Sequence, residues 1–308
     1  GREANSRIGS LSEASRPRGG GVRFNPGYVR IEAMIVFDPV SGRRLARPGV
    51  PVLAARRESL VLAIIFIMMM GCEQNRAIRS AGVPVPQIVA HRGASHDAPE
   101  NTLAAFRLGF EQGADAIEGD FRMTRDGVVI AMHDADLRRT TGDPRRVEDV
   151  DFEDFQQLDA GSWGRWAGGA FIGERVPRLE EVLAIVPEAR VLFIEVKGTL
   201  AMVPALIETI ARSALDRDRV AIISFDAKVI AACKKQMPEV KALWITAFKD
   251  ADGIWTPTAA EVIANAKRMS ADGIDVQANP EVVTSEFVAA VHAAGLECHV
   301  WTIDDPEA

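Results

Sequence analysis

The 308-residue sequence predicts an α/β fold, namely a (β/α)8 TIM barrel whose last βα unit is missing at the C-terminus. From Gln87 onward, short apolar runs alternate with stretches of helical period, and polar side chains recur where the runs end. Regular strand–helix alternation is typical of a parallel sheet covered by helices. Seven such strands favour a barrel over an open sheet, and no GxGxxG motif follows the first strand to support a dinucleotide-binding fold.

The composition excludes several classes of protein. With 47% hydrophobic residues the chain is too apolar to be disordered throughout, and with three Cys it is not a disulfide-stapled scaffold. The net charge of −7 averages two different parts, because residues 1–80 carry +7 and residues 81–308 carry −14. The acidic balance argues against broad nucleic-acid binding, which requires excess positive charge.

The basic part begins with an extension and a short apolar segment. Residues 1–55 are rich in Arg, Gly, Pro and Ser without a sustained apolar period, so we expect them to be disordered or a start-site artefact. In residues 56–72, two Arg precede eleven uninterrupted apolar residues and then Gly71 and Cys72. This run is shorter than the roughly 20 residues that cross a bilayer, and its setting is typical of a secretory signal peptide.

The end of this segment resembles the signal of bacterial lipoproteins, in which the residue at Cys72 becomes the lipidated first residue. The resemblance implies an extracytoplasmic protein, in the periplasm or cell envelope, with a membrane contact only through that anchor. The alternatives are a cleaved signal without lipid, an uncleaved anchor, a buried helix, or a cytoplasmic protein with a spurious N-terminus. Residues 73–85 would then link this segment to a barrel spanning 86–308.

Seven strands are expected in the barrel, and helical stretches such as Val283–Ala294 connect most of them. The strands are placed, in chain order, at 88–90, 116–117, 191–194, 220–223, 242–245, 273–276 and 298–301. Asp126-Gly127 predicts a hairpin turn after the second strand, and residues 134–178 are expected to form a small insertion beyond it. Without an eighth strand, strands one and seven would expose unpaired edges, so we expect the chain to be a fragment.

Polar side chains gather where the expected strands end. In barrels of this kind the chemistry lies at the C-terminal ends of the strands, and strand side chains two residues apart share a face. His299 and Trp301 share a face at the end of the seventh strand, where the role of His299 stays open. One rim is predicted to carry His91, Arg92, Glu118, Asp120, Glu195 and Lys197, with His133 brought beside them by the hairpin.

This combination of residue types predicts phosphodiester cleavage. Glu118, Asp120 and Glu195 would repel one another at one point unless a cation lay among them, and all-oxygen ligation favours Mg²⁺ or Ca²⁺. Arg92 and Lys197 at the same mouth suit a phosphate group. The two His of the rim can divide the roles of general base and general acid near neutral pH.

The same region resembles the glycerophosphodiester phosphodiesterase family over about residues 87–308, in order and at the family's spacings. The family is a (β/α)8 barrel that hydrolyses glycerophosphodiesters to sn-glycerol 3-phosphate and an alcohol. The stretches that carry the resemblance are His91-Arg92-Gly93-Ala94, Ala98-Pro99-Glu100-Asn101-Thr102, Glu118-Gly119-Asp120, Thr124-Arg125-Asp126-Gly127, His133-Asp134, Leu137-Arg138-Arg139-Thr140-Thr141-Gly142, Leu158-Asp159-Ala160-Gly161-Ser162-Trp163, Pro177-Arg178-Leu179-Glu180-Glu181, Glu195-Val196-Lys197 and Val300-Trp301-Thr302.

Carried over residue by residue, the resemblance implies a role for each side chain of the rim. In the family, attack by the glycerol hydroxyl next to the phosphate would give a cyclic phosphate that water then opens. The implied roles are acid–base catalysis for His91 and His133, Ca²⁺ or Mg²⁺ ligation for Glu118, Asp120 and Glu195, phosphate binding for Arg92 and Lys197, and a wall of the glycerol pocket for Trp301.

Other readings of the chain stay open beside this one. On the same barrel, a lysophospholipase D or a sphingomyelinase D-like enzyme would act on a different phosphodiester. An inactive, lipid-anchored binding protein is a rival of another class. We expect a small-molecule glycerophosphodiester as the partner and no nucleic acid, with the oligomeric state unknown. Trp163, Trp166 and Phe171 would form either a rim of the pocket or a local core, and Cys233 and Cys298 are expected to be buried free thiols.

Overall fold

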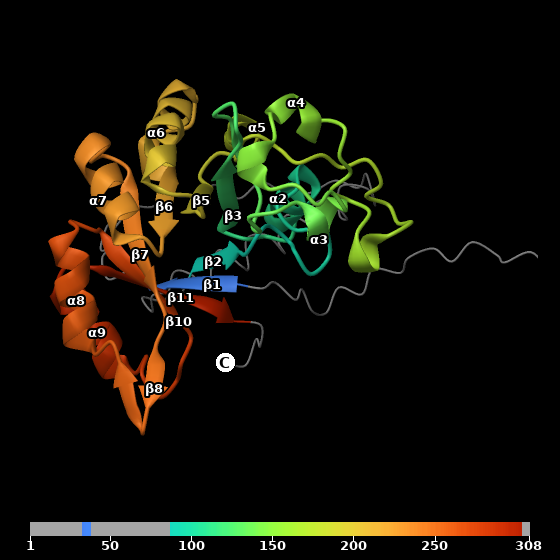
Figure 1. Ribbon diagram of the computed structural model, residues 1–308. Coiled ribbons are helices and arrows are strands. Elements are labelled where there is room, and N and C mark those ends of the chain that lie inside the picture. Colours follow the sequence, from blue (N-terminus) through green and yellow to red (C-terminus); the bar gives the residue numbers. More distant parts are fainter. Residues whose placement is uncertain (1–32, 38–86, 304–308) are drawn as a thin grey trace, which may run out of the picture.

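The computed structural model describes residues 33–37 and 87–303, and Figure 1 shows the arrangement of their helices and strands. Seven parallel strands curl round one another in the order of a barrel, as the sequence predicted. The expected linker, the apolar segment and Cys72 lie outside the described residues. These seven strands are β2 (Gln87–Ala90), β3 (Ala116–Met123), β5 (Val191–Val196), β6 (Val220–Ser224), β7 (Lys241–Thr246), β10 (Gly273–Gln277) and β11 (Glu297–Ile303).

An additional strand lies between the first and last of these. Strand β1 (Ala33–Phe37) pairs antiparallel with both β2 and β11. For these five residues the structure differs from the expected disorder of 1–55. The edges of β2 and β11 that we expected to stay unpaired both find backbone partners in β1.

Helices α2 and α5 to α9 alternate with the strands and cover the outside of the sheet, whereas α3 and α4 lie in segment 134–178 to one side (Figure 1). Short β4 (Val129–Ala131) pairs antiparallel with β3, which confirms the hairpin expected at Asp126-Gly127. Strands β8 (Lys249–Ala251) and β9 (Ile254–Thr256) form a separate hairpin. The α-helices are α2 (Leu103–Glu111), α3 (Arg138–Thr141), α4 (Phe152–Phe155), α5 (Leu179–Ala184), α6 (Val203–Arg212), α7 (Ala227–Gln236), α8 (Ala259–Arg268) and α9 (Ser285–Ala293).

Side-chain caps fix where several helices begin. The hydroxyl of Thr102 accepts a hydrogen bond from the backbone N–H of Ala105 at the start of α2, and Thr284 caps α9 in the same way. At α8, Thr258 and Glu261 form a reciprocal capping box. Each such cap stabilises its helix by about 1 kcal/mol. Because α2 begins directly beyond the β2 loop, its cap also fixes the segment that carries Asn101.

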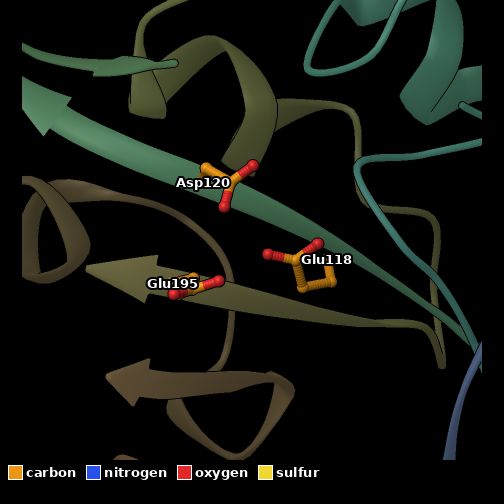
Figure 2. A group of neighbouring side chains, drawn as sticks. All are labelled: Glu118, Asp120 and Glu195. Atoms are coloured by element: carbon orange, nitrogen blue, oxygen red, sulfur yellow. The ribbon is translucent and has the colours of Figure 1, made fainter. Parts of the chain in front are cut away.

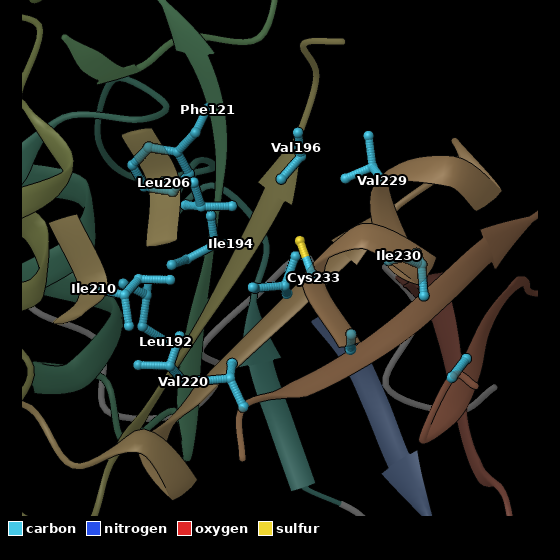
Figure 3. Packing of buried hydrophobic residues seen from close by; sticks show 14 of the residues in the cluster. Phe121, Leu192, Ile194, Val196, Leu206, Ile210, Val220, Val229, Ile230 and Cys233 are labelled. Carbon is cyan, nitrogen blue, oxygen red and sulfur yellow. The ribbon is translucent and has the colours of Figure 1, made fainter. Parts of the chain in front are cut away.

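The core has an outer and an inner part because strand side chains alternate between faces. The outer cluster packs the sheet against the helices, and Figure 3 shows Ile194 of β5 beside Leu206 and Ile210 of α6. Cys233 and Cys298 are buried free thiols in this cluster, as expected, and burial raises their pKa. The inner cluster fills the barrel with Val89, Ala116, Phe193, Ala221, Ile223, Leu243 and Ile245.

Segment 134–178, which we expected as an insertion, carries a small cluster of its own. This cluster packs against the β4 side of the barrel. The aromatic residues Trp163, Trp166 and Phe171 of the segment do not belong to the cluster. Trp166 and Phe171 instead contact each other edge to face, and Trp163 lies under the guanidinium of Arg139. The buried members are Ile130, Met132, Leu137, Val147, Val150, Phe155, Ala160 and Val176.

No helix within the described residues is both apolar enough and long enough to span a bilayer.

A polar triplet, of which only His299 is fully buried, lies at the start of β11. Glu297 contacts Lys241 at 2.6 Å and His299 at 3.3 Å, and His299 packs edge-on against Phe193 of the inner cluster. Burial alone would raise the pKa of Glu297, but its bonds to His299 and Lys241 outweigh this and lower the pKa to about 2. His299, whose role the sequence left open, therefore belongs to this triplet and does not line the cavity at the C-terminal ends of the parallel strands.

We expect Glu297→Gln to lower the free energy of unfolding at pH 7 by about 2 kcal/mol. A folded pKa near 2, below the ordinary 4.5, stabilises the fold above pH 4.5, and this stabilisation fades as the pH falls towards 2. Denaturant unfolding at pH 7 and pH 3 measures this contribution to the free energy of unfolding. The difference in free energy of unfolding between Glu297→Gln and the wild type should be smaller at pH 3 than at pH 7. The exposed control Glu239→Gln should differ little from the wild type at either pH. A gap that stays constant with pH would contradict the assignment.

Candidate active site

The C-terminal ends of the parallel strands surround a cavity of about 340 Å³. It holds seven of the eight barrel residues that the sequence proposed, and Asp120 lies buried beside it. A depression of about 530 Å³ outside the barrel, between α5 and α6, holds none of them. The lining residues are His91, Arg92, Glu118, His133, Glu195, Lys197, Ile223, Phe225, Ile245, Asp275, Trp301 and Thr302.

Three carboxylates meet at one point in this site. Glu118 and Asp120 lie two residues apart in β3, and Glu195 pairs with Asp120 across the β3–β5 ladder. One oxygen from each of the three lies within 4.8 Å of the others (Figure 2). All three side chains are buried, with at most 6% of the residue exposed. This convergence follows from strand alternation, which turns 118 and 120 inward together.

The electrostatics of the three carboxylates suit the binding of a cation. Burial and the neighbouring charge of Asp120 raise the pKa of Glu118 above its ordinary value. Burial would also raise the pKa of Asp120, but the charges of Arg92 and Lys197 outweigh it and lower the pKa. Oε1 of Glu118 is buried with no hydrogen-bond partner among the described residues. An all-oxygen set with an unpartnered buried oxygen fits a hard divalent cation such as Ca²⁺ or Mg²⁺.

Two cations stand beside these carboxylates. Lys197 Nζ lies 3.2 Å from Asp120 and 2.8 Å from Glu195, and Arg92 Nε lies 3.0 Å from Asp120. Burial alone would lower the pKa of Lys197, but the charges of Asp120 and Glu195 raise it, so the ammonium stays protonated. The amide of Asn101 also holds Asp120, because it donates at 2.8 Å to Oδ2, the oxygen that faces Arg92. Arg92 and Lys197 therefore place two positive side chains at the cavity, each ion-paired with a carboxylate.

Backbone conformation aims Arg92 into the site. Both Arg92 and Asn101 adopt positive φ, at 56° and 59°, which is uncommon for residues with a Cβ and is found where function requires it. Gly93 follows with φ 77°, and a Cβ there would lie 2.5 Å from the carbonyl carbon of Ala105. Only glycine therefore fits the tight turn that carries the chain from β2 against the start of α2.

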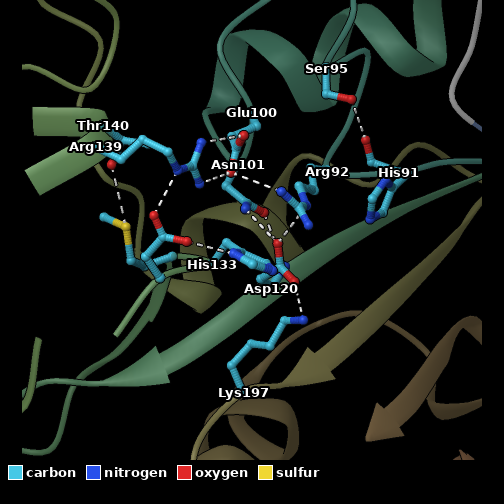
Figure 4. A network of polar contacts seen from close by, with 12 residues as sticks. His91, Arg92, Ser95, Glu100, Asn101, Asp120, His133, Arg139, Thr140 and Lys197 are labelled. Carbon is cyan, nitrogen blue, oxygen red and sulfur yellow. Dashed lines mark hydrogen bonds and ion pairs between the residues drawn. The ribbon is translucent and has the colours of Figure 1, made fainter. Parts of the chain in front are cut away.

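A chain of charged hydrogen bonds links the two ends of the site, as Figure 4 shows. Asp134 binds Nδ1 of His133 at 2.7 Å and the Nε of Arg139 at 2.6 Å. Arg139 also donates to both oxygens of Glu100, which in turn accepts from Arg92 at 3.2 Å. His133 is thereby oriented by Asp134, and its position is coupled to that of Arg92 across 41 residues of sequence.

The two His have different surroundings. Burial lowers the pKa of His133 below 6.5, although the charge of Asp120 and the bond to Asp134 partly oppose this. His133 is therefore neutral at pH 7 and able to accept a proton. His91 Nε2 lies 4.0 Å from Glu118 Oε2 on the other side of the cavity. The pair can thus approach a bound phosphate from two elements, the end of β2 and the segment after β4.

Some functional neighbours escaped the sequence reasoning. Asp134 and Glu100 belong to stretches that carried the family resemblance, but they were given no role there. Asp275, in the strand expected at 273–276, was given no role either. Trp301 reaches the cavity as expected, and its ring Nε1 donates to the carbonyl of Asp275 at 3.3 Å. The aromatic residues of 134–178 do not line this cavity.

Comparisons with known proteins agree with this site. The "Glycerophosphoryl diester phosphodiesterase family" matches residues 91–308. A "Glycerophosphodiester phosphodiesterase" from Caldanaerobacter subterraneus subsp. tengcongensis is 37% identical over 158 residues, which cover 50% of this chain and 64% of that protein. One from Bacillus altitudinis is 32% identical over 212 residues, covering 67% of this chain and 82% of the relative. In the first of these comparisons, the chain spans less than two thirds of the relative's length.

The fold is also similar to those of solved phosphodiesterase structures. An Oleispira antarctica phosphodiesterase, in complex with the product sn-glycerol-3-phosphate, is 25% identical with a TM-score of 0.62, over 72% of this chain and 86% of that one. A glycerophosphodiester phosphodiesterase from Agrobacterium tumefaciens is 29% identical with a TM-score of 0.54, over 68% and 84% of the two chains. Since the family match extends over more than half of the sequence and includes the whole rim of the barrel, this chain belongs to the glycerophosphoryl diester phosphodiesterase family.

Proposed function

We propose that this protein hydrolyses glycerophosphodiesters to sn-glycerol 3-phosphate and an alcohol. The observation that carries the proposal is the meeting of three carboxylates, two cations and two His around one cavity. Family membership and the product bound to the Oleispira antarctica relative support the same substrate class.

In the proposed mechanism, the chain's own groups bind the phosphate and move protons. Arg92 and Lys197 hold the non-bridging phosphate oxygens, which fixes the diester between the two His. One His accepts the proton of the attacking hydroxyl, and the other donates a proton to the departing alcohol oxygen. Attack by the neighbouring glycerol hydroxyl would give a cyclic phosphate, and the same pair with reversed roles would serve its opening by water.

The proposed cofactor is a single divalent cation, Ca²⁺ or Mg²⁺, held by Glu118, Asp120 and Glu195. When bound, such a cation stabilises negative charge that develops on phosphoryl oxygens. It would also reverse the local sign of the electrostatic potential in a region whose formal charge is otherwise strongly negative.

An assay of the full chain on several glycerophosphodiesters tests the proposed function. Incubation with glycerophosphocholine is expected to yield sn-glycerol 3-phosphate and choline. Release of choline from lysophosphatidylcholine, with none from glycerophosphocholine, would instead indicate a lysophospholipase D. Binding of the diesters without turnover would indicate a binding protein.

We further propose that the protein is exported and carries lipid on Cys72. The support is the order of a basic pair, an apolar run and Gly71-Cys72 in the sequence. Mass spectrometry of protein isolated from its native membrane tests this. A diacylated peptide that begins at Cys72 is the expected result, and an unmodified Cys72 would contradict lipidation.

A further inference from the structure

The cavity contains a fourth acidic side chain, Asp275, that the proposed mechanism does not use. Asp275 lies in β10, only 1% of the residue is exposed, and it lines the cavity together with Ile223, Ile245 and Trp301. Its Oδ1 is buried and has no hydrogen-bond partner among the described residues. A buried polar atom without a partner is costly, so such an atom in a substrate cavity points to a group that the substrate supplies.

Asp275 is not placed to join the proposed metal ligands. Among the described residues, the group whose oxygens lie mutually within 4.8 Å is Glu118, Asp120 and Glu195. Strands β6 and β7 separate β10 from the β5 strand of Glu195, so Asp275 lies on another wall of the barrel. Burial, with the charges of Glu195 and Glu118, raises the pKa of Asp275 well above its ordinary value, so Asp275 faces the same interior as these two carboxylates.

The surroundings of Asp275 select one kind of ligand group. A phosphate oxygen would be held at the opposite wall by Arg92 and Lys197, and it would be repelled by a carboxylate here. A hydroxyl group can donate to a carboxylate and can also accept from a carboxylic acid, so it suits Asp275 in either form. Trp301, whose ring is fixed by its bond to the Asp275 carbonyl, gives the carbon skeleton of such a polyol a flat apolar surface.

We propose that Asp275 hydrogen-bonds a free hydroxyl of the substrate's glycerol moiety and so selects glycerol-bearing phosphodiesters over diesters without that hydroxyl. This specificity role rests on the proposed function, because it assigns the glycerol end of the diester to the β10 wall. The physical basis is that a site built to bond a hydroxyl discriminates against a ligand lacking it, since the buried carboxyl would then stay unpartnered.

Binding measurements on the full chain, with Ca²⁺ or Mg²⁺ present, test the proposal without requiring turnover. Wild-type protein is expected to bind sn-glycerol 3-phosphate more tightly than inorganic phosphate. Asp275→Leu should weaken binding of sn-glycerol 3-phosphate about 10- to 100-fold and leave phosphate binding within about threefold. Asp275→Asn still offers hydrogen-bonding groups, so its affinity for sn-glycerol 3-phosphate should lie between those of the wild type and Asp275→Leu. Exposed Asp218→Asn, the same substitution at the other end of the barrel, should bind both ligands as wild type does.

Kinetic measurements add a second arm. On glycerophosphocholine, Asp275→Leu should lower kcat/KM by the same 10- to 100-fold, with much less effect on bis(p-nitrophenyl) phosphate, which has no glycerol. The melting temperature should not fall, because an unpartnered buried carboxyl is replaced by an apolar group of similar size.

Each alternative outcome overturns the proposal in a recognisable way. Equal losses of affinity for sn-glycerol 3-phosphate and phosphate would assign Asp275 a structural role. No loss of affinity for either ligand would show that Asp275 does not contact the bound ligand. A loss confined to choline-containing substrates would assign it to the leaving group. A wild-type protein that binds sn-glycerol 3-phosphate no better than phosphate overturns the inference, whereas selective binding without turnover contradicts only the proposed hydrolysis.

Discussion

Replacing His133 by alanine is expected to reduce kcat at least about 100-fold while the barrel stays folded. His133 lies at the cavity with Nδ1 held by Asp134 at 2.7 Å, so loss of its ring removes an oriented proton carrier and little packing. Steady-state kinetics on glycerophosphocholine, with circular dichroism as the check on folding, measure this. His292→Ala, on helix α9 away from the cavity, is the matched control and should keep its activity. A folded His133→Ala protein with near-normal kcat would exclude the acid–base assignment.

The same residue sets an expectation for pH. Burial lowers the pKa of His133 below 6.5, so the limb of the pH–rate profile that belongs to His133 should lie below pH 6.5. The hydrogen bond that His133 donates to the carboxylate of Asp134 acts in the other direction and raises this pKa. Asp134→Asn should therefore shift the limb further towards acid. A shift towards alkali would show that Asp134 does not stabilise the protonated ring.

Removal of divalent cations is the second change with a large expected effect. Treatment with EDTA should lower activity on the order of 100-fold or more, because charge stabilisation by a bound cation contributes several kcal/mol to such reactions. Added Ca²⁺ or Mg²⁺ should restore activity and should also raise the melting temperature, since an ion that binds only the folded state stabilises it.

A carboxylate variant links this effect to the three-carboxylate site. Glu118→Gln keeps the shape of the side chain and removes a charge that the proposed cation requires. It should lose both the cation-dependent rise in melting temperature and most of the activity. Exposed Glu111→Gln at the end of α2 should retain both. Full turnover of the wild type in excess chelator would contradict the metal assignment.

Much of this arrangement could be predicted because it depends on short-range regularities. Period-two alternation turned Glu118 and Asp120 to one face, and the turn at Asp126-Gly127 returned His133 to the level of the site. The order of strands and helices then placed His91, Glu118 and Glu195 at one end of a barrel. None of these steps requires knowledge of how loops pack.

What escaped prediction depends on contacts between distant loops. The bond from Arg139 to Glu100 joins residues 39 apart, and it exists only because the segment after β4 packs over the β2 loop. Asp275 lies in a strand that the sequence predicted, but its lack of a partner among the described residues is a property of the folded interior. Strand β1 is a short apolar run, Ala33–Phe37, inside a stretch whose overall composition suggested disorder, and the run becomes part of the barrel by pairing with β2 and β11.

Strand β1 has a consequence for processing of the chain. Residues 33–37 precede Cys72, so a signal peptidase that cut before Cys72 would release them from the barrel. The backbone of β2 and β11 would then need a new neighbour, because exposed strand edges invite pairing with other chains. Cleavage before Cys72 would therefore end the covalent connection between β1 and the barrel, so the maturation state of the chain determines whether β1 and the parallel strands belong to one polypeptide.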